Sequence, residues 1–598
     1  MLMQKNRLMF LAAALAGVAA LSVSCKEPEP EVVVNPPSLT AFSFKAADNA
    51  VLSEDYVATV NGKSIDVALP DVDKSALVAT FTVAEGNIVK VNGTVQVSGK
   101  TANDFSSGAT YVVSDANDAN PVSYAVNVTL APDKHPALLS FSFDVDKNAE
   151  ALSKTLVGEI NGTEIGVAVP QVADISALVA TFTTGAGNKV TVNGVEQVSG
   201  VTVNDFTNPV DYLVTNLDGS VNAMFSVTLN RQKGSWTPGP AYAAVPVHAG
   251  ARILVNPADD IPYVAFKRHQ PTEADARDPE KDEKMYAMKL VDGAWVSLGE
   301  AFSEKVGSDY DFSISPSGTP FIAYRNSATS PSVTTVMKYA GGAWSNVGDN
   351  VGTAATTKIH LHAIADDKVV VCQIMSNKTY VGVWDGASWT TGGIPALTGD
   401  PRPYEIRMAG DGANAYMFSI NRAKALDGVN YGHNVMKFNG NEWSGLRQNY
   451  LREGATQTSI VGYDIAVAPD GTVYLVTGDN AEDNEKYHHR VEKYNADGTW
   501  SQVGSTIDYV LSSRCYSKIA VAPDGTPFVV YPNEGADPKT IEVVYFDSET
   551  KQWSAPATLV CGSTPYTGDP SLSFVFDSKG KGYVTWVEGS GLVLYTFE

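Results

Sequence analysis

The chain has 598 residues, of which 44% are hydrophobic, 9% aromatic and only 18% charged, a composition typical of a folded protein. This length exceeds what one hydrophobic core serves, so roughly two to four domains are expected. The net charge of −23 argues against nucleic acid or another polyanion as partner, because counterion release needs patches of Lys and Arg. Val, Thr, Gly and Ser are plentiful, which favours strands and turns over helices. Beyond the N-terminus no apolar run of about 18 residues occurs, so no membrane-spanning helix is expected.

Residues 1–24 have the pattern of an export signal peptide. Lys5 and Arg7 supply a basic start, an apolar segment follows, and small residues lead to Cys25. A cleavage site at this Cys, followed by KEPEPE, resembles a bacterial lipoprotein signal, although Leu21 stands one place further from the Cys than is usual. The acidic stretch is also similar to the surface-export signal of Bacteroidota lipoproteins. The resemblance implies a lipid on Cys25, anchorage in the outer membrane and exposure at the cell surface; the alternative is a secretory signal with an incidental Cys.

Two tandem copies of one domain, at 37–132 and 135–232, follow an acidic, Pro-punctuated tether at 25–36. SALVATF occurs at both 75–81 and 176–182, and VNG, QVSG and NDF motifs recur at nearly the same offset. Each copy alternates apolar and polar residues between Asn-Gly turns, which predicts a β-sandwich of immunoglobulin type. The repeated motifs resemble an uncharacterised Ig-like family found in tandem on Bacteroidota surface lipoproteins, and this resemblance implies no chemistry. We interpret the copies as spacers, with a ligand site on them as the alternative.

The rest of the chain repeats a β-hairpin. IAVAPDGTPFVVY at 519–531 is matched by IAVAPDGTVYLVT at 465–477 and FSISPSGTPFIAY at 312–324. Seven second strands of this kind occur, and the segments between them share an aromatic residue, a small turn and a Trp. These Trp residues are Trp295, Trp344, Trp389, Trp443, Trp500 and Trp553. Four strands with one Trp in each ~50 residues predict a β-propeller.

Six Trp residues for seven second strands leave the last unit one strand short. The chain ends on a third strand, GLVLYTF (591–597), and GSWTPGP (234–240) supplies a fourth strand with Trp236 as the seventh Trp. Pairing of these segments closes the ring and removes free sheet edges. We therefore predict an all-β protein with two sandwiches and a seven-bladed propeller at 234–598. The propeller is similar to kelch and WD propellers in architecture only, since their blade motifs are absent.

Turn lengths distinguish the two faces of the predicted propeller. First-to-second and third-to-fourth turns are tight, as in APDG and NGN, whereas second-to-third loops and connections between blades are long, as at 267–284, 421–434 and 447–464. Because strands alternate in direction, the tight turns share one face (the tight-turn face) and the long loops share the other (the long-loop face). Binding residues concentrate on loops held by a rigid scaffold, so we expect the site at the channel mouth on the long-loop face.

Aligning the seven first strands on their turns gives the side chains expected around that mouth. The position before the first core apolar residue holds Arg252, Asp311, His360, Glu405, Asp464, Lys518 and Ser573. Tyrosines lie nearby at Tyr310, Tyr404, Tyr463 and Tyr516, and on the loops at Tyr431, Tyr450, Tyr487 and Tyr566. A ligand-binding ring is one interpretation. The other is that charges of alternating sign pair with one another and with buried water.

Two binding functions fit this pattern. The first is a lectin-like surface protein for a neutral glycan, because tyrosine offers an apolar face to sugar C–H groups and a hydroxyl to their polar edges. The second is a protein-binding platform or a subunit of a surface complex.

An enzyme is the third interpretation and the least favoured. A glycoside hydrolase needs two carboxylates, for which Asp311, Glu405 and Asp464 are candidates. A polysaccharide lyase needs a base beside a charge neutraliser, for which the candidates are His360, Tyr404 and Arg402. Hydrolase and sialidase propellers have five or six blades, and the sialidase arginine triad and repeated Asp-box are missing here.

No metal or cofactor site is predicted. His360 and His362 share a strand face, but a lone His-x-His lacks the further ligands of a zinc site, and the acidic loop 273–283 lacks EF-hand spacing. Cys372 lies in an apolar strand and is expected to be buried. Cys515 and Cys561 begin and end one blade, so their expected separation disfavours a disulfide, and both states stay open.

Overall fold

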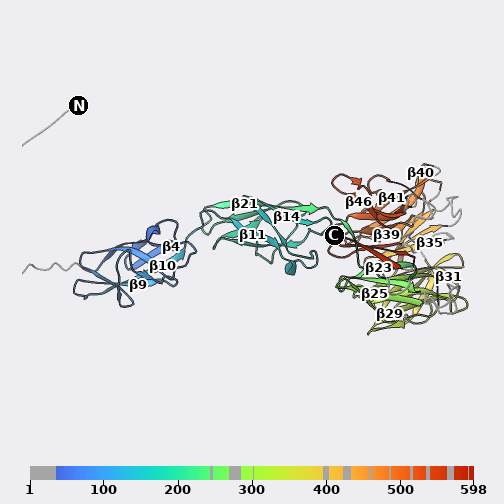
Figure 1. The fold of residues 1–598 in the computed structure, drawn as a ribbon, viewed down its shortest axis with the longest axis horizontal. Coiled ribbons are helices and arrows are strands. Elements are labelled where there is room, and N and C mark those ends of the chain that lie inside the picture. The colour runs from blue at the N-terminus through green and yellow to red at the C-terminus, as the bar shows by residue number, and fades with distance from the viewer. Residues whose placement is uncertain are drawn as a thin grey trace, which may run out of the picture. The chain divides into compact units, whose positions relative to one another are not determined.

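The computed structural model describes residues 36–242, 247–268, 284–300, 302–394, 403–421, 432–456, 458, 462–483, 486–511, 516–533, 536, 539–561, 572–589 and 591–598. Within these ranges the chain is all-β, as predicted, with two short 3-10 helices, η1 (Ala46–Asp48) and η2 (Val145–Lys147), and no α-helix (Figure 1). No helix of this described part is long and apolar enough to cross a membrane. The signal peptide, Cys25, Arg402 and the acidic loop 273–283 lie outside the described residues.

The first sandwich has two sheets. One is ordered β2 (Tyr56–Val57), β1 (Leu39–Phe44), β5 (Leu77–Val83), β8 (Ala102–Asn103). The other is ordered β3 (Thr59–Asn61), β4 (Ser64–Leu69), β10 (Val122–Leu130), β9 (Ala109–Ser114), β6 (Ile88–Val91), β7 (Thr94–Val95). Alternation of apolar and polar residues sends one side of each strand into the core, where Phe44 and Phe105 meet edge to face at 4.8 Å.

The second sandwich repeats this plan. Its large sheet is ordered β13 (Glu159–Asn161), β14 (Glu164–Pro170), β21 (Asn222–Gln232), β20 (Val210–Thr215), β17 (Lys189–Val192), β18 (Val195–Glu196). Opposite it lie β12 (Leu156–Val157), β11 (Leu138–Phe143) and β16 (Thr181–Thr184), with the pair β15 (Leu178–Val179) and β19 (Val203–Asn204). A buried asparagine recurs in the two copies: Asn49 Oδ1 accepts the N–H of Val78 at 2.7 Å, and Asn148 Oδ1 that of Val179 at 2.8 Å.

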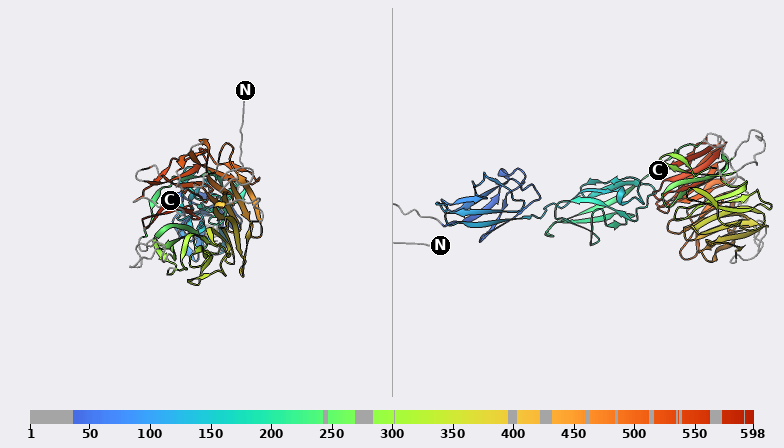
Figure 2. Two further views of the ribbon diagram at one scale, coloured as in Figure 1. Left: turned by 90° about the vertical axis from the view of Figure 1, so that its right-hand side faces the viewer. Right: turned by 90° about the horizontal axis from the view of Figure 1, so that it is seen from below.

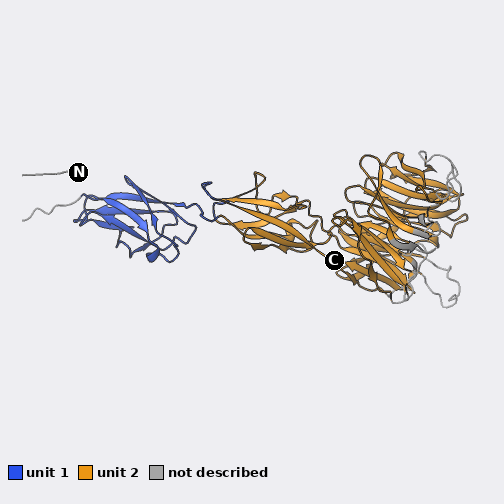
Figure 3. Cartoon of the chain, turned by 90° about the horizontal axis from the view of Figure 1, so that it is seen from above, with its two compact units in different colours: residues 1–135, 186–188, 216–221 blue, residues 136–185, 189–215, 222–598 orange. Residues whose placement is uncertain are grey.

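By contacts between residues the chain divides into two compact units (Figure 3). The first holds residues 1–135 with 186–188 and 216–221, and the second holds 136–185, 189–215 and 222–598. The second sandwich and the C-terminal sheets therefore belong to one unit, whereas we had expected separate domains.

Seven sheets, five of four strands and two of five, build the β-propeller, seen in two further views in Figure 2. In chain order they are β23 (Val247–Asn256), β24 (Ile261–Arg268), β25 (Lys284–Val291), β26 (Ala294–Ser297); β27 (Val306–Ile314), β28 (Pro320–Asn326), β29 (Val333–Ala340), β30 (Ala343–Asn346); β31 (Thr356–Ala365), β32 (Lys368–Met375), β33 (Lys378–Trp384), β34 (Trp389–Gly393); and β35 (Pro403–Gly410), β36 (Ala415–Asn421), β37 (His433–Phe438), β38 (Trp443–Tyr450).

The remaining three sheets follow the same order. They are β39 (Asp464–Val467), β40 (Val473–Asp483), β41 (Lys486–Tyr494), β42 (Trp500–Gln502) with β43 (Ile507–Leu511) beside β41; β44 (Lys518–Val521), β45 (Pro527–Asn533), β46 (Thr540–Asp547), β47 (Gln552–Trp553) with β48 (Ala557–Leu559) beside β46; and β49 (Leu572–Phe576), β50 (Gly582–Glu588), β51 (Gly591–Phe597), β22 (Trp236–Pro238). We number these sheets as blades one to seven.

The repeated tryptophan joins neighbouring blades. In five blades its indole N–H donates to a backbone carbonyl of the preceding blade at 2.8–3.3 Å: Trp295 to Pro240, Trp344 to Leu298, Trp389 to Val347, Trp500 to Leu446 and Trp553 to Ser505. A half-buried indole has an apolar body and one donor, so it packs between two sheets and satisfies its N–H there.

The ring closes through a strand from each end of the propeller. β22 pairs antiparallel with β51, with Trp236 opposite Phe597. The backbone amides of Ser235 and Glu598 exchange hydrogen bonds at 2.8 and 3.1 Å. The closing strand thus lies where the sequence predicted it.

Loop lengths on the long-loop face differ from the prediction in two blades. In the third blade Ser376 and Asn377, with φ of 50° and 61°, make a tight connection between β32 and β33. In the seventh blade only residues 589 and 590 separate β50 from β51. In the third blade, two consecutive residues with positive φ match the twist of the flanking strands, so a two-residue connection suffices.

The second sandwich contacts tight turns of the propeller. Val172 is 1% exposed and packs in one apolar cluster with Phe576. A Cβ on Gly580, in the β49–β50 turn, would lie 2.9 Å from Val172 Cγ2. Arg231 Nη1 lies 3.3 Å from Asp524 Oδ2, in the β44–β45 turn. These contacts place the sandwich on the tight-turn face.

The described cysteines are reduced. Cys372 is fully buried, as expected, and Cys561 is buried and free. Cys515 lies outside the described residues.

Ring closure predicts an effect of adding one methyl group. A Cβ on Gly234 would lie 2.2 Å from Phe597 Cζ, so Gly234→Ala has to displace the ring that packs on Trp236. We expect the free energy of unfolding to fall by about 1–3 kcal/mol, the usual cost of overpacking. Gly392→Ala in β34, where the added carbon meets nothing within 4 Å, is the control. Equal thermal melting of the two variants would contradict this role of the closing strand.

Candidate functional site

Seven side chains from the first strands of the blades surround the channel at one level. In five blades the residue lies three positions before the last residue of the first strand that pairs across the tight turn. Arg252 lies four positions before it, and His360 five, because the register of its strand shifts between Ala363 and Ala365. We call these side chains the inner ring: Arg252, Asp311, His360, Arg407, Asp464, Lys518 and Ser573. All seven line a cavity of about 580 Å³ that continues to Pro257, Pro316 and Pro469 at the tight turns.

In the fourth blade the ring residue is Arg407, where the sequence alignment had placed Glu405. Arg407 pairs with Phe418, three residues before the pair Gly410 and Ala415 that closes the hairpin. Glu405 lies one step nearer the long-loop face, where its carboxylate is 2.9 Å from Lys358 Nζ and 3.6 Å from Arg407 Nη1. Counting back from the turn, rather than forward to the first apolar residue, would have found the arginine.

The inner-ring charges pair with one another. Arg252 Nε lies 3.2 Å from Asp311 Oδ1, and Asp311 Oδ2 lies 3.1 Å from His360 Nδ1. His360 Nε2 is 3.4 Å from Arg407 Nη1. Burial lowers the pKa of His360, so the neutral imidazole donates from Nδ1 to the carboxylate and accepts at Nε2 from the guanidinium. Burial raises the pKa of Asp311, but His360 and Arg252 outweigh it, and the net shift is downward.

Ring side chains also hold the next blade. Asp311 Oδ2 accepts the N–H of Leu361 at 3.1 Å, and Asp464 Oδ2 that of Ile519 at 3.3 Å. Ser573 Oγ accepts the N–H of Ile253 at 3.1 Å across the closure between the seventh and first blades. The Lys518 ammonium lies 3.5 Å from Asp464. This repeated geometry supports a structural role for the inner ring.

The predicted tyrosines fall into two groups. Tyr310 is 3% exposed and donates to the carbonyl of Gly250 at 3.2 Å, and Tyr463 is 1% exposed, stacked on Phe418 with the Arg407 guanidinium 4.7 Å from its ring. Neither offers a ring face to a ligand.

Tyr404 and Tyr516 are only half-buried and lie where β35 and β44 begin, on the long-loop face. Tyr450 is also half-buried, with the Arg447 guanidinium 4.0 Å from its ring. Tyr431, Tyr566 and the side chain of Tyr487 lie outside the described residues.

A buried charge network between the fourth and fifth blades was missed by sequence reasoning. Arg447 donates twice to Glu492, at 3.0 and 3.2 Å. Arg490 lies 3.0 Å from Asp479 and 3.4 Å from Glu492. Arg452, with a side chain 28% exposed, approaches Asp479 at 3.5 Å, so the network reaches the surface there. The available signal was Arg490 and Glu492, two charged residues two apart and so on one face of a third strand (HRVEKY).

His433 borders this network. Its Nε2 lies 3.2 Å from Arg447 Nη1, and its Nδ1 lies 3.4 Å from Thr458 Oγ1. Burial first, and Arg447 second, lower the pKa of His433 to about 3. The imidazole is therefore neutral and accepts from the guanidinium. Among the described residues no group of three or more His, Cys, Asp or Glu side chains is placed to hold a metal ion.

The comparisons with known proteins bear on both parts of the second unit. Residues 140–229, in the second sandwich, match the family model described as SGBP, N-terminal. No curated protein sequence matches the chain.

Three solved structures match part of the chain. An ulvan lyase of a new polysaccharide lyase family, bound to GlcA(1-4)Rha3S, has a TM-score of 0.40 and 12% identity over 60% of this chain and 95% of its own. The six-bladed, fucose-recognising lectin of Aleuria aurantia has a TM-score of 0.34 and 12% identity, over 48% of this chain and 90% of its own. An α-L-arabinanase of Penicillium chrysogenum complexed with arabinobiose has a TM-score of 0.35 and 11% identity, over 60% of this chain and 98% of its own.

Buried neutral histidines predict a loss of stability in mild acid. Burial lowers the pKa of His433 and His489 to about 3 and that of His362 to about 4, from 6.5. Between pH 6.5 and 4 the unfolded chain takes up these protons and the folded chain does not, so the free energy of unfolding falls as the pH falls. Each histidine contributes on the order of 1 kcal/mol per pH unit.

Chemical denaturation between pH 6.5 and 5 measures this slope. His433→Gln removes one of the three groups and should flatten the slope, whereas His135→Gln, at an exposed position outside the propeller, serves as the control. An unchanged slope in the first variant would show that His433 is protonated in the folded protein.

Proposed function

We propose that the protein is a lipid-anchored cell-surface protein that binds a neutral glycan on the long-loop face of its propeller. The observation that carries the proposal is the match of residues 140–229 to a domain of surface glycan-binding proteins. The charge of −23 is in keeping with an uncharged ligand.

Contacts of the second sandwich support the choice of face. Val172 and Arg231 bind tight turns of the sixth and seventh blades, so the tight-turn face carries the domain that leads back toward the N-terminus. The long-loop face is the one that this contact leaves for a ligand.

Half-buried aromatic rings beside paired charges form the proposed binding surface. Tyr404 and Tyr516 would stack on sugar rings, and the pair of Lys358 and Glu405 would supply donors and acceptors. Arg252, Asp311, His360, Asp464 and Lys518, which we first considered as ligand contacts, would then stand behind this surface as a support.

The same geometry weighs against hydrolysis. Glycosidases need one carboxyl group that holds a proton. Asp311 pairs with His360 and Arg252, which lower its pKa and oppose its protonation. Glu405 and Asp464 are each paired with a lysine.

Tyrosine substitutions test the face. Tyr404→Ala and Tyr516→Ala should each weaken binding by about 1–2 kcal/mol, because each removes a stacking face at the centre of the site. Binding of the purified chain to laminarin, galactomannan, arabinan and xyloglucan is measured by affinity electrophoresis. Tyr339→Ala, a half-buried tyrosine next to the tight turn after β29, is the matched control. If the chain binds a polysaccharide and neither Tyr404→Ala nor Tyr516→Ala weakens the binding, the long-loop site is wrong. If the chain releases reducing sugar from the polysaccharide, it is an enzyme and not only a binding protein.

Cys25 tests the anchor. Cys25→Ser removes the thiol that would be acylated, so the protein should move from the membrane fraction to the soluble fraction. Detergent-free fractionation with immunoblotting measures the shift. A variant that stays with the membrane would contradict lipid anchoring at this residue.

A further inference from the structure

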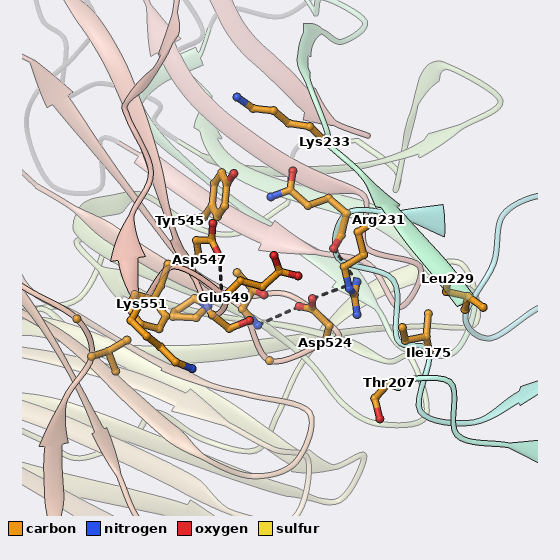
Figure 4. A pocket seen from close by; sticks show the side chains of 18 of the residues that line it. Ile175, Thr207, Leu229, Arg231, Lys233, Asp524, Tyr545, Asp547, Glu549 and Lys551 are labelled. Atoms are coloured by element: carbon orange, nitrogen blue, oxygen red, sulfur yellow. Dashed lines mark hydrogen bonds and ion pairs between the residues drawn. The ribbon is translucent and has the colours of Figure 1, made fainter. Parts of the chain in front are cut away.

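A second cleft lies away from the long-loop face, where the second sandwich meets the propeller. Its volume is about 1010 Å³, larger than the channel cavity of about 580 Å³ and at the upper end of the range for ligand sites. Figure 4 shows Tyr545, Asp547 and Lys551 on one side of it and Thr207, Leu229 and Ile175 on the other.

Both walls come from elements with fixed partners. The sandwich wall is the turn at 207–209 and the end of β21. The propeller wall is the β44–β45 turn with the segment 545–551, which comprises the end of β46 and the turn after it. Tyr545 packs on Phe528, with ring centroids 5.3 Å apart, and its backbone N–H donates to Ser554 Oγ at 3.1 Å.

One arginine fixes the distance between the walls. Arg231 Nη1 donates to the carbonyls of Gln171 at 2.6 Å and Ala173 at 3.1 Å, and lies 3.3 Å from Asp524 Oδ2 across the cleft (Figure 4). Asp524 is itself held, because its Oδ1 accepts the N–H of Thr526 at 3.0 Å. The cleft is thus formed before a ligand arrives, which lowers the entropic cost of binding.

The arginine that sets this distance is absent from the first sandwich. When VNVTL at 126–130 is aligned with FSVTL at 225–229, Pro132 stands where the second copy has Arg231. The cleft is therefore a property of this copy and not of the repeated fold.

The polar lining suits an uncharged, polyhydroxylated ligand. Amide and hydroxyl side chains predominate, among them Gln171, Asn208, Asn230, Gln502, Thr526 and Ser548. Charges of both signs are nearly balanced, with Arg231 and three lysines against Asp524, Asp547 and Glu549. Amides, hydroxyls and a half-buried tyrosine together match alternating hydroxyl edges and C–H faces of a sugar.

We propose that this cleft is a second glycan-binding site, which takes an uncharged segment of a polysaccharide independently of the long-loop face. A polyanion is not favoured over a neutral chain, because the cationic and anionic side chains of the lining nearly balance. The two sites lie on opposite faces of the propeller, so a ligand at one does not exclude a ligand at the other.

A bulky side chain at the rim tests the proposal without touching either core. Asn208 is exposed, and Asn208→Trp fills the sandwich side of the cleft. Ser107, exposed on the equivalent turn of the first sandwich, provides the matched control Ser107→Trp. Affinity electrophoresis of the purified chain with laminarin, galactomannan, arabinan and xyloglucan is the assay, with polygalacturonate as the polyanion.

We expect Asn208→Trp to weaken binding of a neutral polysaccharide by roughly tenfold and Ser107→Trp to leave it unchanged. Tyr545→Phe, which keeps the packing and removes the hydroxyl, should weaken it less. If Tyr404→Ala and Tyr516→Ala have no effect and Asn208→Trp does, the cleft site stands without the long-loop site. Equal binding by the Asn208 and Ser107 variants, retention by polygalacturonate alone, or no retention by any neutral polysaccharide would overturn the cleft site.

Discussion

Pairing of β22 with β51 is the contact on which the rest of the second unit depends. It joins a strand that begins at Trp236 to one that ends at Phe597, and so removes the two edges that an open ring of sheets would expose. The same pairing fixes where the chain enters, because β51 ends on the tight-turn face and β22 runs antiparallel to it. β21, the last strand of the second sandwich, ends at Gln232, only a few residues before β22 begins at Trp236. The second sandwich therefore packs on that face. Closure of the ring therefore also determines which face is left for loops.

The interior of the propeller shows how buried charge is accommodated without a ligand. Removing an ion from water costs several kcal/mol unless a partner and hydrogen bonds compensate it. Arg252, Asp311, His360 and Arg407 form one continuous series of such partners. Because Asp311 and Asp464 also accept a backbone N–H from the next first strand, each fixes the height of its neighbour. These charged side chains therefore help to fix the position of each first strand relative to the next.

Sequence reasoning succeeded where a repeat carried the signal. The hairpins and tryptophans located the sheets, and the spare Trp236 located the closing strand. It failed where burial depends on a neighbouring blade. Tyr463 precedes a first strand and was expected beside the channel mouth, yet Phe418 of the preceding blade covers it.

Two further errors have physical causes. Glu405 directly precedes the apolar Ile406, so the sequence alignment placed it in the inner ring. The strand pairing shows that Arg407 occupies that position. The contacts of Gln171 and Arg231 were not predicted, because nothing in a local pattern shows that the tight turn at Asp524 lies against them.

The central claim is that a glycan binds the face opposite the second sandwich. Hydrogen–deuterium exchange of the whole chain, with and without the neutral polysaccharide that retains it, tests this most directly. The account predicts slower exchange in the peptides that contain residues 403–408 and 516–519, where β35 and β44 begin on the long-loop face. Protection confined to the sandwiches, residues 36–232, would contradict it.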